Sequence, residues 1–244
     1  MNKWKIIQIN ECLSTNSLVK GMKKDGQLEN KTAILAGYQT KGRGRGENSW
    51  FSDENKNLLC SIYTQTNIKV KEHFILSIIT SLSIIDLLQE IKIKAKIKWP
   101  NDIYIHDKKV AGILIENSLL NDNIKDTVIG IGLNINQQEF PEHLPNPTSI
   151  LLATQKEIEP VAILKRLLEI LESYLNLNHE ELHHDIYHTY NAALYRINEW
   201  HLFKTNEHFF NGRIHGVKPD GRLLVETDGG QMHQFDFGEI QFEI

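Results

Sequence analysis

The hydrophobic pattern changes period abruptly in the middle of this chain. Between Lys71 and Ile91 large apolar residues recur at helical spacing, which predicts a buried helix: Phe74, Ile75, Ile78, Ile79, Leu82, Ile85 and Leu88. From Lys92 to Trp99 lysines alternate with apolar residues, the two-residue repeat of a half-exposed strand. Pro100 ends this strand. A chain that carries both periods side by side is predicted to be an α+β protein with a mixed or antiparallel sheet.

Other segments continue this mixture of strands and helices. Further strands are predicted at residues 1–11, Thr32–Gln39, Leu58–Thr64 and Thr127–Ile135, and hairpin arms at Ile103–Ile105 and Val110–Glu116 around a turn at His106–Lys109. Helices are predicted from Ser14 to about Lys24 and over residues 160–177 and 179–194.

The C-terminal part is predicted to be a small β-barrel. Phe209–Val217, Arg222–Thr227 and Gln231–Phe237 resemble short strands, separated by the turn sequences Lys218–Gly221 and Asp228–Gly230. The expected organisation is a main domain over residues 1–196 and the barrel over residues 203–244. The barrel is expected to pack against the main domain, because about 40 residues alone bury little core.

Composition narrows the function classes. A net charge of −4 and a pI near 6.3 argue against a general nucleic-acid binder, which gains affinity from clustered basic charge. No apolar run is long enough to span a bilayer, and the start lacks the pattern of a signal peptide, so we expect a cytoplasmic protein without membrane contact. The two cysteines, Cys12 and Cys60, favour neither a disulfide framework nor a zinc site.

The segment Gly42–Gly46 reads Gly-Arg-Gly-Arg-Gly and is a candidate anion-binding loop. Its glycines allow close approach of the backbone to a ligand, and Arg43 and Arg45 supply charge in a fork that matches carboxylate and phosphate. A mobile surface loop and an RNA-binding arginine-glycine segment are alternatives. A P-loop is excluded, because Arg43-Gly44 stands where Lys-Ser/Thr is required.

Three further segments place polar residues at strand ends. In Lys98-Trp99-Pro100-Asn101-Asp102, the last two side chains are placed to hydrogen-bond a ligand or hold magnesium, although a simple turn also satisfies the pattern. Lys109 precedes a strand whose Ala111 and Gly112 leave room beside the backbone, although a lysine in a hairpin turn is usually solvated. In Gly130–Asn136, two glycines weaken a strand unless another group packs there.

Taken together and in order, these segments resemble the biotin protein ligases. The resemblance covers about residues 8–136 and rests on these pieces: Ser14-Thr15-Asn16, Gln39-Thr40, Gly42-Arg43-Gly44-Arg45, Trp50, Lys98–Asp102, Lys109 with Ala111–Glu116, and Gly130–Asn134. The tail, with Gly216-Val217, Gly221 and Leu223–Glu226, looks like the family's SH3-like C-terminal domain. The resemblance implies a class II synthetase-like catalytic domain with a mixed sheet.

The resemblance also implies an activity. Such an enzyme forms biotinyl-5′-AMP from biotin and ATP with Mg²⁺, then transfers biotin to a lysine of a biotin carboxyl carrier protein domain of a biotin-dependent carboxylase. The implied biotin-binding residues are Ser14, Thr15, Asn16, Gln39, Arg43, Gly44, Arg45, Trp50, Lys109 and Gly112. The implied ATP-binding residues are Arg43, Arg45, Lys98, Trp99, Asn101, Lys109 and Asn134. Lys109, Arg45 and Asp102 are the implied catalytic residues, with Asp102 also a candidate magnesium ligand.

Departures from the family pattern qualify these expectations. Gly46–Ser49 replaces the more basic continuation of the arginine loop found in many members. The chain begins almost at the first catalytic strand, so we expect a monofunctional ligase without a DNA-binding domain. A lipoate ligase or octanoyl transferase of the same fold is the alternative function. His184 and His188, four residues apart, are expected to lie on a solvated helix face rather than to bind a metal. Whether the protein forms a homodimer is left open.

Overall fold

The computed structural model describes residues 4–177, 179–205 and 208–243, with the backbone alone for residues 179–184. The helices are α1 (Thr15–Lys24), α2 (Ile75–Glu90), α3 (Ile150–Thr154), α4 (Pro160–Leu175) and α5 (His179–Ala192), with a 3-10 helix η1 (Val70–Glu72). The strands of the larger sheet are β1 (Lys5–Cys12), β2 (Thr32–Gln39), β3 (Leu58–Lys69), β4 (Lys96–Lys98), β5 (Asp102–Ile105), β6 (Lys108–Leu120) and β7 (Asn123–Leu133). Those of the smaller sheet are β8 (Trp200–Lys204), β9 (Phe209–Val217), β10 (Leu223–Thr227), β11 (Met232–Phe235) and β12 (Gln241–Phe242).

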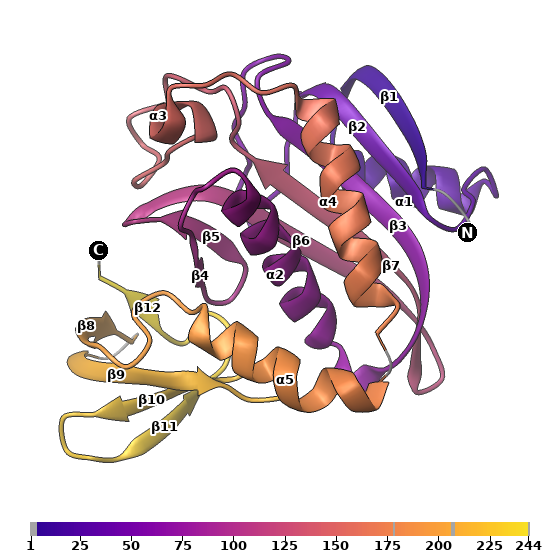
Figure 1. Ribbon diagram of the computed structural model, residues 1–244. Coiled ribbons are helices and arrows are strands. Elements are labelled where there is room, and N and C mark those ends of the chain that lie inside the picture. Colours follow the sequence, from indigo (N-terminus) through magenta and orange to yellow (C-terminus); the bar gives the residue numbers. More distant parts are fainter. Residues whose placement is uncertain (1–3, 178, 206–207, 244) are drawn as a thin grey trace.

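The larger sheet has seven strands in the order β1-β2-β3-β7-β6-β5-β4 (Figure 1). β1 and β2 run parallel, and the other neighbouring pairs run antiparallel. The sheet is therefore mixed, and the α+β expectation is confirmed. At the centre of the sheet, β7 pairs over nearly its whole length with β3 on one side and with β6 on the other. The candidate motifs lie on or beside these three strands.

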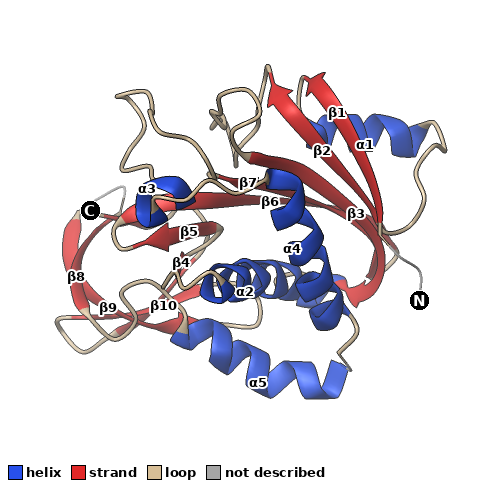
Figure 2. Cartoon of the chain, turned by 45° about the horizontal axis from the view of Figure 1, so that its top comes forward, coloured by secondary structure: helices blue, strands red, loops and turns tan. Residues whose placement is uncertain are grey.

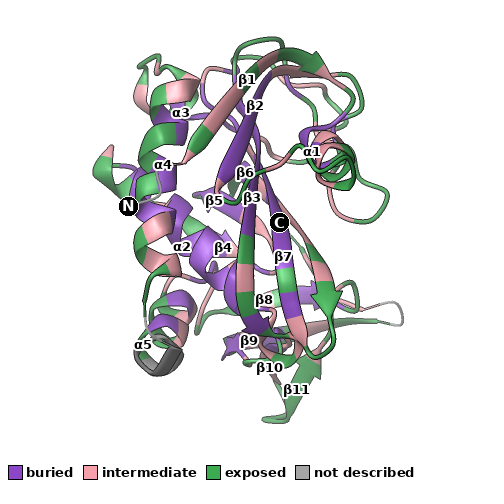
Figure 3. Cartoon of the chain, turned by 90° about the vertical axis from the view of Figure 1, so that its right-hand side faces the viewer, coloured by how far each residue is buried: buried purple, intermediate pink, exposed green. Residues whose placement is uncertain are grey.

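The two faces of this sheet are covered by different helices (Figure 3). On β7, Ile129, Ile131 and Leu133 pack into the main core with α2 and α4, while Val128 faces α1 in a smaller cluster with Val19. The alternation follows from the two-residue period of a strand. α2 is buried nearly all round, as expected of a helix that is apolar on every side.

The smaller sheet is antiparallel, with the order β11-β10-β9-β8-β12. It lies at the lower left of Figure 1, beside α5. Trp99 connects the two sheets, because its indole nitrogen donates a hydrogen bond of 2.9 Å to the carbonyl oxygen of Gly221. Two strands of the smaller sheet, β8 and β12, were not predicted from the sequence, since both are short and neither has an alternating pattern.

Several local predictions are confirmed and others are wrong. The strands predicted at Thr32–Gln39 and Phe209–Val217 have those bounds. The strand predicted at Lys92–Trp99 is reduced to β4, because Lys92 adopts a positive φ of 64° in the turn that follows α2. Lys109 lies within β6 rather than in a turn, since the hairpin turns at His106-Asp107, where His106 has a φ of 52°. The short helix α3 was missed.

Among the described residues, none of the helices is both long and apolar enough to cross a membrane.

A partly buried ion pair fixes α1 to the sheet. Lys23 Nζ lies 2.5 Å from Asp126 Oδ1 and donates a hydrogen bond of 2.6 Å to Ser118 Oγ. The Asp126 side chain is 1% exposed, so it depends on Lys23 for compensation of its charge. Because Ser14–Asn16 at the start of α1 contribute to the site described below, this pair also stabilises the position of the site.

We expect Lys23→Met to lower the free energy of unfolding by about 3 kcal/mol, because it leaves the carboxylate of Asp126 buried and unpaired. Lys5→Met is the matched control. It removes the pair with Glu29, whose side chains are 50% and 73% exposed, and should cost less than about 1 kcal/mol. Urea denaturation measures both values. Equal losses in the two variants would contradict the role of Lys23.

Candidate active site

A cavity of about 680 Å³ lies between the larger sheet and the C-terminal sheet. Its walls are the start of α1, the ends of β6 and β7, the turn from Trp99 to Asp102, and the loop that contains Arg43 and Arg45. The C-terminal sheet contributes Phe237 and the β12 region, and the segment between β7 and α3 contributes Phe140 and Leu144. The size is that of a pocket for a small-molecule ligand or nucleotide. Fold and topology thus bring the sequence motifs together in one place.

One end of the cavity is lined by uncharged polar side chains, beside an arginine that is paired with a carboxylate. Ser14 is the N-cap residue of α1, but its side chain makes no capping hydrogen bond. The amide nitrogen and the hydroxyl of Thr15 both donate to Gln39 Oε1, at 2.8 and 3.0 Å. Ser14, Thr15 and Gln39 all line the cavity. The Ser61 hydroxyl lies 2.7 Å from Thr15 Oγ1.

Asn16 supports this end from behind. Its amide nitrogen donates to the carbonyl oxygen of Leu114 and to Glu116 Oε2, at 3.2 and 2.9 Å. Its Oδ1 lies 2.5 Å from the Ser61 hydroxyl. These contacts fix α1 to β6. Asn16 also lines the cavity, so its contact with a ligand stays a prediction. A β-carbon added at Gly130 would lie 2.3 Å from this Oδ1, which explains one of the strand glycines.

The other two glycines make room for an indole ring. Gly112 on β6 and Gly132 on β7 are directly paired across the strands, and Trp50 lies over both. A β-carbon would lie 2.3 Å from the Trp50 ring at Gly132 and 2.9 Å at Gly112. Strand glycines of this kind mark a close approach of another group. Here that group is Trp50, which forms an apolar wall in the middle of the cavity.

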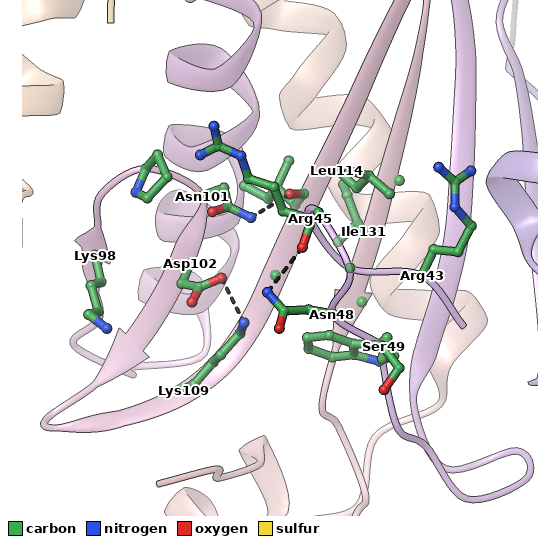
Figure 4. Close-up of a pocket in the computed structure, with 18 of the residues that line it drawn as sticks. Arg43, Arg45, Asn48, Ser49, Lys98, Asn101, Asp102, Lys109, Leu114 and Ile131 are labelled. Atoms are coloured by element: carbon green, nitrogen blue, oxygen red, sulfur yellow. Dashed lines mark hydrogen bonds and ion pairs between the residues drawn. The ribbon is translucent and has the colours of Figure 1, made fainter. Parts of the chain in front are cut away.

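The opposite end is cationic (Figure 4). Lys109 Nζ on β6 forms an ion pair of 2.7 Å with Asp102 Oδ1 at the start of β5, and it lies 5.6 Å from the centre of the Trp50 ring. Lys98 lies near the Tyr104 hydroxyl, at 3.3 Å, and burial lowers the pKa of its ammonium group. With Arg45, this end of the cavity carries three cations beside one carboxylate.

The arginine loop has a defined conformation. Its backbone closes on itself, with hydrogen bonds from Gly44 N to Asn48 O (2.7 Å) and from Trp50 N to Gly42 O (3.0 Å). Arg43 and Arg45 diverge, as Figure 4 shows. The alternative of an unstructured surface loop is therefore not supported.

The two arginines have different partners. Arg43 forms an ion pair with Glu116 at 3.1 Å, on the α1 side of the cavity. The guanidinium carbon of Arg45 lies 4.1 Å from the centre of the Phe237 ring, and burial lowers the pKa of Arg45.

The two asparagines at the strand ends, Asn101 and Asn134, differ in the hydrogen bonds that their side chains make. Asn101 donates its amide hydrogen to Ile113 O at 2.8 Å and so fixes the turn to β6. Asn134 donates to Thr148 O at 2.9 Å, but its buried Oδ1 has no partner among the described residues. The buried Trp50 Nε1 is likewise without a partner there. Buried polar atoms are normally hydrogen-bonded, so these two atoms indicate where a ligand would complete the site.

Sequence reasoning missed the residues that enter the cavity from outside the motifs. Phe237, Ile240 and Phe242 come from the C-terminal sheet, and Tyr104 comes from β5. Nothing in their local pattern distinguishes them from ordinary core residues. Only the clustering of aromatic residues near the end of the chain gives a signal, and it does not say which surface they cover.

A magnesium ion brought by a nucleotide would fit this site, whereas an all-protein metal centre would not. The described residues contain no cluster of three or more His, Cys, Asp or Glu side chains, and Asp102 is the carboxylate at the cavity. Mg²⁺ in nucleotide sites commonly takes one or two carboxylates and completes its shell with phosphates and water. The side chain of His184 lies outside the described residues, so the expectation for His184 and His188 stays a prediction.

Comparisons with known proteins agree with the architecture. The family model described as Biotin/lipoate A/B protein ligase family matches residues 11–134, and that of the Biotin protein ligase C terminal domain matches residues 203–243. The chain is 30% identical over 203 residues to the bifunctional ligase/repressor BirA of Bacillus subtilis, covering 82% of this chain and 62% of that protein. It is 29% identical over 166 residues to the biotin–[acetyl-CoA-carboxylase] ligase of Mycobacterium tuberculosis, covering 66% and 60%.

A solved structure extends the likeness over nearly the whole chain. The biotin protein ligase from Aquifex aeolicus in complex with biotin and ATP is 27% identical, with a TM-score of 0.77 and 98% of each chain covered. The resemblance stated from the sequence is thereby confirmed at the level of family and fold. This chain belongs to the biotin/lipoate A/B protein ligase family.

Proposed function

We propose that this protein is an ATP-dependent biotin protein ligase. It forms biotinyl-5′-AMP from biotin and ATP and then transfers biotin to a lysine of a biotin carboxyl carrier protein. The observation that carries the proposal is a single cavity that is polar and neutral at one end and cationic at the other, in a chain of this family. Those two ends match the two ends of biotin, a neutral ureido ring and a carboxylate.

The neutral end supplies the groups that a buried ureido ring needs. Ser14, Thr15 and Gln39 carry hydroxyl and amide groups, which can both donate and accept hydrogen bonds. Trp50, whose ring lies over Gly112 and Gly132, then packs beside the apolar part of the ligand. In this arrangement the carboxylate points to Lys109 and Arg45.

The cationic end addresses the main obstacle to the first step. The carboxylate must approach the α-phosphorus of ATP, and two anions about 4 Å apart repel by ~4 kcal/mol at an effective dielectric near 20. Lys109 and Arg45 offset this repulsion in fixed positions. A carboxylate oxygen forms a bond to the α-phosphorus, and the bond to pyrophosphate breaks. In the second step the carrier's neutral amine attacks the acyl carbon, and AMP and a proton are released.

Asp102 is the proposed contact for magnesium. When Mg²⁺ enters with ATP, it would offset charge on the phosphates, and Asp102 would supply one oxygen ligand to it. Asp102 meanwhile pairs with Lys109 and so orients the ammonium group toward the cavity. Asn134, with its unpartnered Oδ1, and Lys98 are proposed to contact the nucleotide.

Biotin is preferred to lipoate as the acyl substrate for a specific reason. The matched family model covers ligases for both, but the C-terminal match is to the domain named for biotin protein ligases. The similar solved structures include complexes with biotin and ATP. RNA binding by the arginine loop is disfavoured, because Arg43 is paired with Glu116 and the net charge is −4.

The direct test is incubation of the protein with ATP, magnesium and a biotin carrier domain, offered biotin or lipoate in parallel. We expect the carrier mass to increase by one biotinyl group, with release of pyrophosphate, and no change with lipoate. Lipoylation without biotinylation would reverse the choice of substrate. Absence of acyl transfer with both would overturn the proposed function.

Lys109→Met should slow adenylate formation by roughly 10²–10³-fold, the usual cost of removing one preorganised group that stabilises developing charge. Lys108→Met is the matched control, since Lys108 is the exposed neighbour on the same strand and should leave the rate unchanged. Pyrophosphate release in single turnover measures the step, and thermal unfolding verifies the fold. Equal rates for the two variants would remove Lys109 from the proposed mechanism.

Arg45→Gln should release the adenylate roughly 10- to 100-fold faster, because a charge-assisted hydrogen bond to the acyl phosphate is lost. The escaped adenylate should biotinylate an added bystander protein such as serum albumin. Lys41→Gln, an exposed change in the same loop, should not increase bystander labelling. Indistinguishable labelling by both variants would contradict a role for Arg45 in retaining the adenylate.

A further inference from the structure

The two loop arginines are held by different kinds of contact. The guanidinium group of Arg43 is fixed by a carboxylate, Glu116, which also accepts hydrogen bonds from Lys20 and Asn16. Arg45 has no carboxylate partner among the described residues. Its guanidinium lies over the face of Phe237, with the central carbon 4.1 Å from the ring centre. A stacked guanidinium keeps its N–H edge free for an anion, whereas an ion-paired one does not.

Phe237 is itself fixed by contacts with both sheets. Its ring centre lies 5.1 Å from that of Trp99 and 6.1 Å from that of Phe74, and these two residues belong to the larger sheet's domain. Trp99 donates its indole hydrogen bond to Gly221 O in the smaller sheet. A further side chain at Gly221 would collide with Phe74, at 2.8 Å, so the two layers are in tight contact. Phe237 therefore presents a rigid aromatic surface to the cavity.

The loop alone cannot provide that rigidity. Hydrogen bonds with Asn48 close the backbone around Arg45, but they do not fix the long side chain of this residue. A long side chain on such a segment loses considerable conformational entropy when it is ordered around a ligand. A surface that orders it beforehand lowers this cost.

We propose that Phe237 is a positioning residue that holds Arg45 in place over the acyl-phosphate end of the cavity. This inference rests on the proposed function and deepens it. The C-terminal sheet thereby takes part in retaining the intermediate, through one aromatic ring that stacks on a catalytic-loop arginine. Phe237 acts on the ligand through Arg45.

The test uses the full-length protein and a stable sulfamate-linked analogue of biotinyl-adenylate, with dissociation measured by competition or stopped flow. Phe237→Leu removes the aromatic face while keeping an apolar side chain, and should release the analogue roughly 3- to 30-fold faster, the range expected from a cation–π contact. Phe237→Tyr retains the face and should restore wild-type release. Phe235→Leu is the matched control, because Phe235 packs on Phe210 in the same sheet and does not line the cavity.

A double variant separates positioning from general damage to the fold. In an Arg45→Gln background, Phe237→Leu should add less than a 2-fold change, since its effect passes through Arg45. Full additivity, or an equal effect of Phe235→Leu, would overturn the inference.

Limited trypsin digestion gives a readout that needs no ligand. Cleavage after Arg45, identified by fragment mass, should be faster in Phe237→Leu than in wild type or Phe235→Leu, because the loop loses its anchor. Unchanged cleavage together with unchanged analogue release would overturn the inference while the proposed function stands. A wild-type protein that fails to bind the analogue would overturn the proposed function and the inference that rests on it, whereas the digestion would still report whether Phe237 anchors the loop.

Discussion

The two-residue period of β7 is the constraint on which the rest of this structure depends. One face of the strand must fill the core, and Ile129, Ile131 and Leu133 do so against α2 and α4. The opposite face must leave a space, and Gly130 and Gly132 provide it. Because both requirements fall on alternate residues of one strand, the floor of the cavity is as rigid as the core beneath it. Asn16 occupies the space over Gly130 and Trp50 the space over Gly132, and the two ends of the cavity lie on either side of Trp50.

The cationic side chains of the cavity differ in the kind of partner that holds them. Arg43 and Lys109 each have a carboxylate partner, Glu116 and Asp102, while Arg45 has an aromatic one. Pairing holds a cation in place but offsets its field, whereas an aromatic face holds it with its charge still available. A site with the proposed function, which must gather two anions, needs both properties. The division of contacts in this cavity provides both.

The two sheets form one site because an aromatic layer connects them. Phe237 packs against both Trp99 and Phe74, and a hydrogen bond from Trp99 to the carbonyl oxygen of Gly221 also joins the two parts. A small sheet with little core of its own gains stability from such packing. The smaller sheet also closes one side of the cavity. The C-terminal part of this chain is thus a wall of the candidate site as well as a folding unit.

Local patterns in the sequence determined the elements and the candidate motifs. The apolar period of 75–90 specified α2, the apolar stretch within Thr32–Gln39 specified β2, and the glycines of 130–134 indicated a close approach to a strand. These features depend on neighbours a few residues apart, so the chain carries them in its linear order. The ordered set of motifs was also enough to indicate the family.

Only the tertiary structure decided which partner each functional side chain has. The contact of Arg45 with Phe237 joins residues 192 positions apart in the numbering, and that of Arg43 with Glu116 joins residues 73 apart. The tertiary structure also places Lys109 in β6, beside Asp102, rather than in a turn, and it gives Asn16 hydrogen-bond partners on β6. Such contacts arise from the folding of distant segments onto each other, and no local period or spacing encodes them.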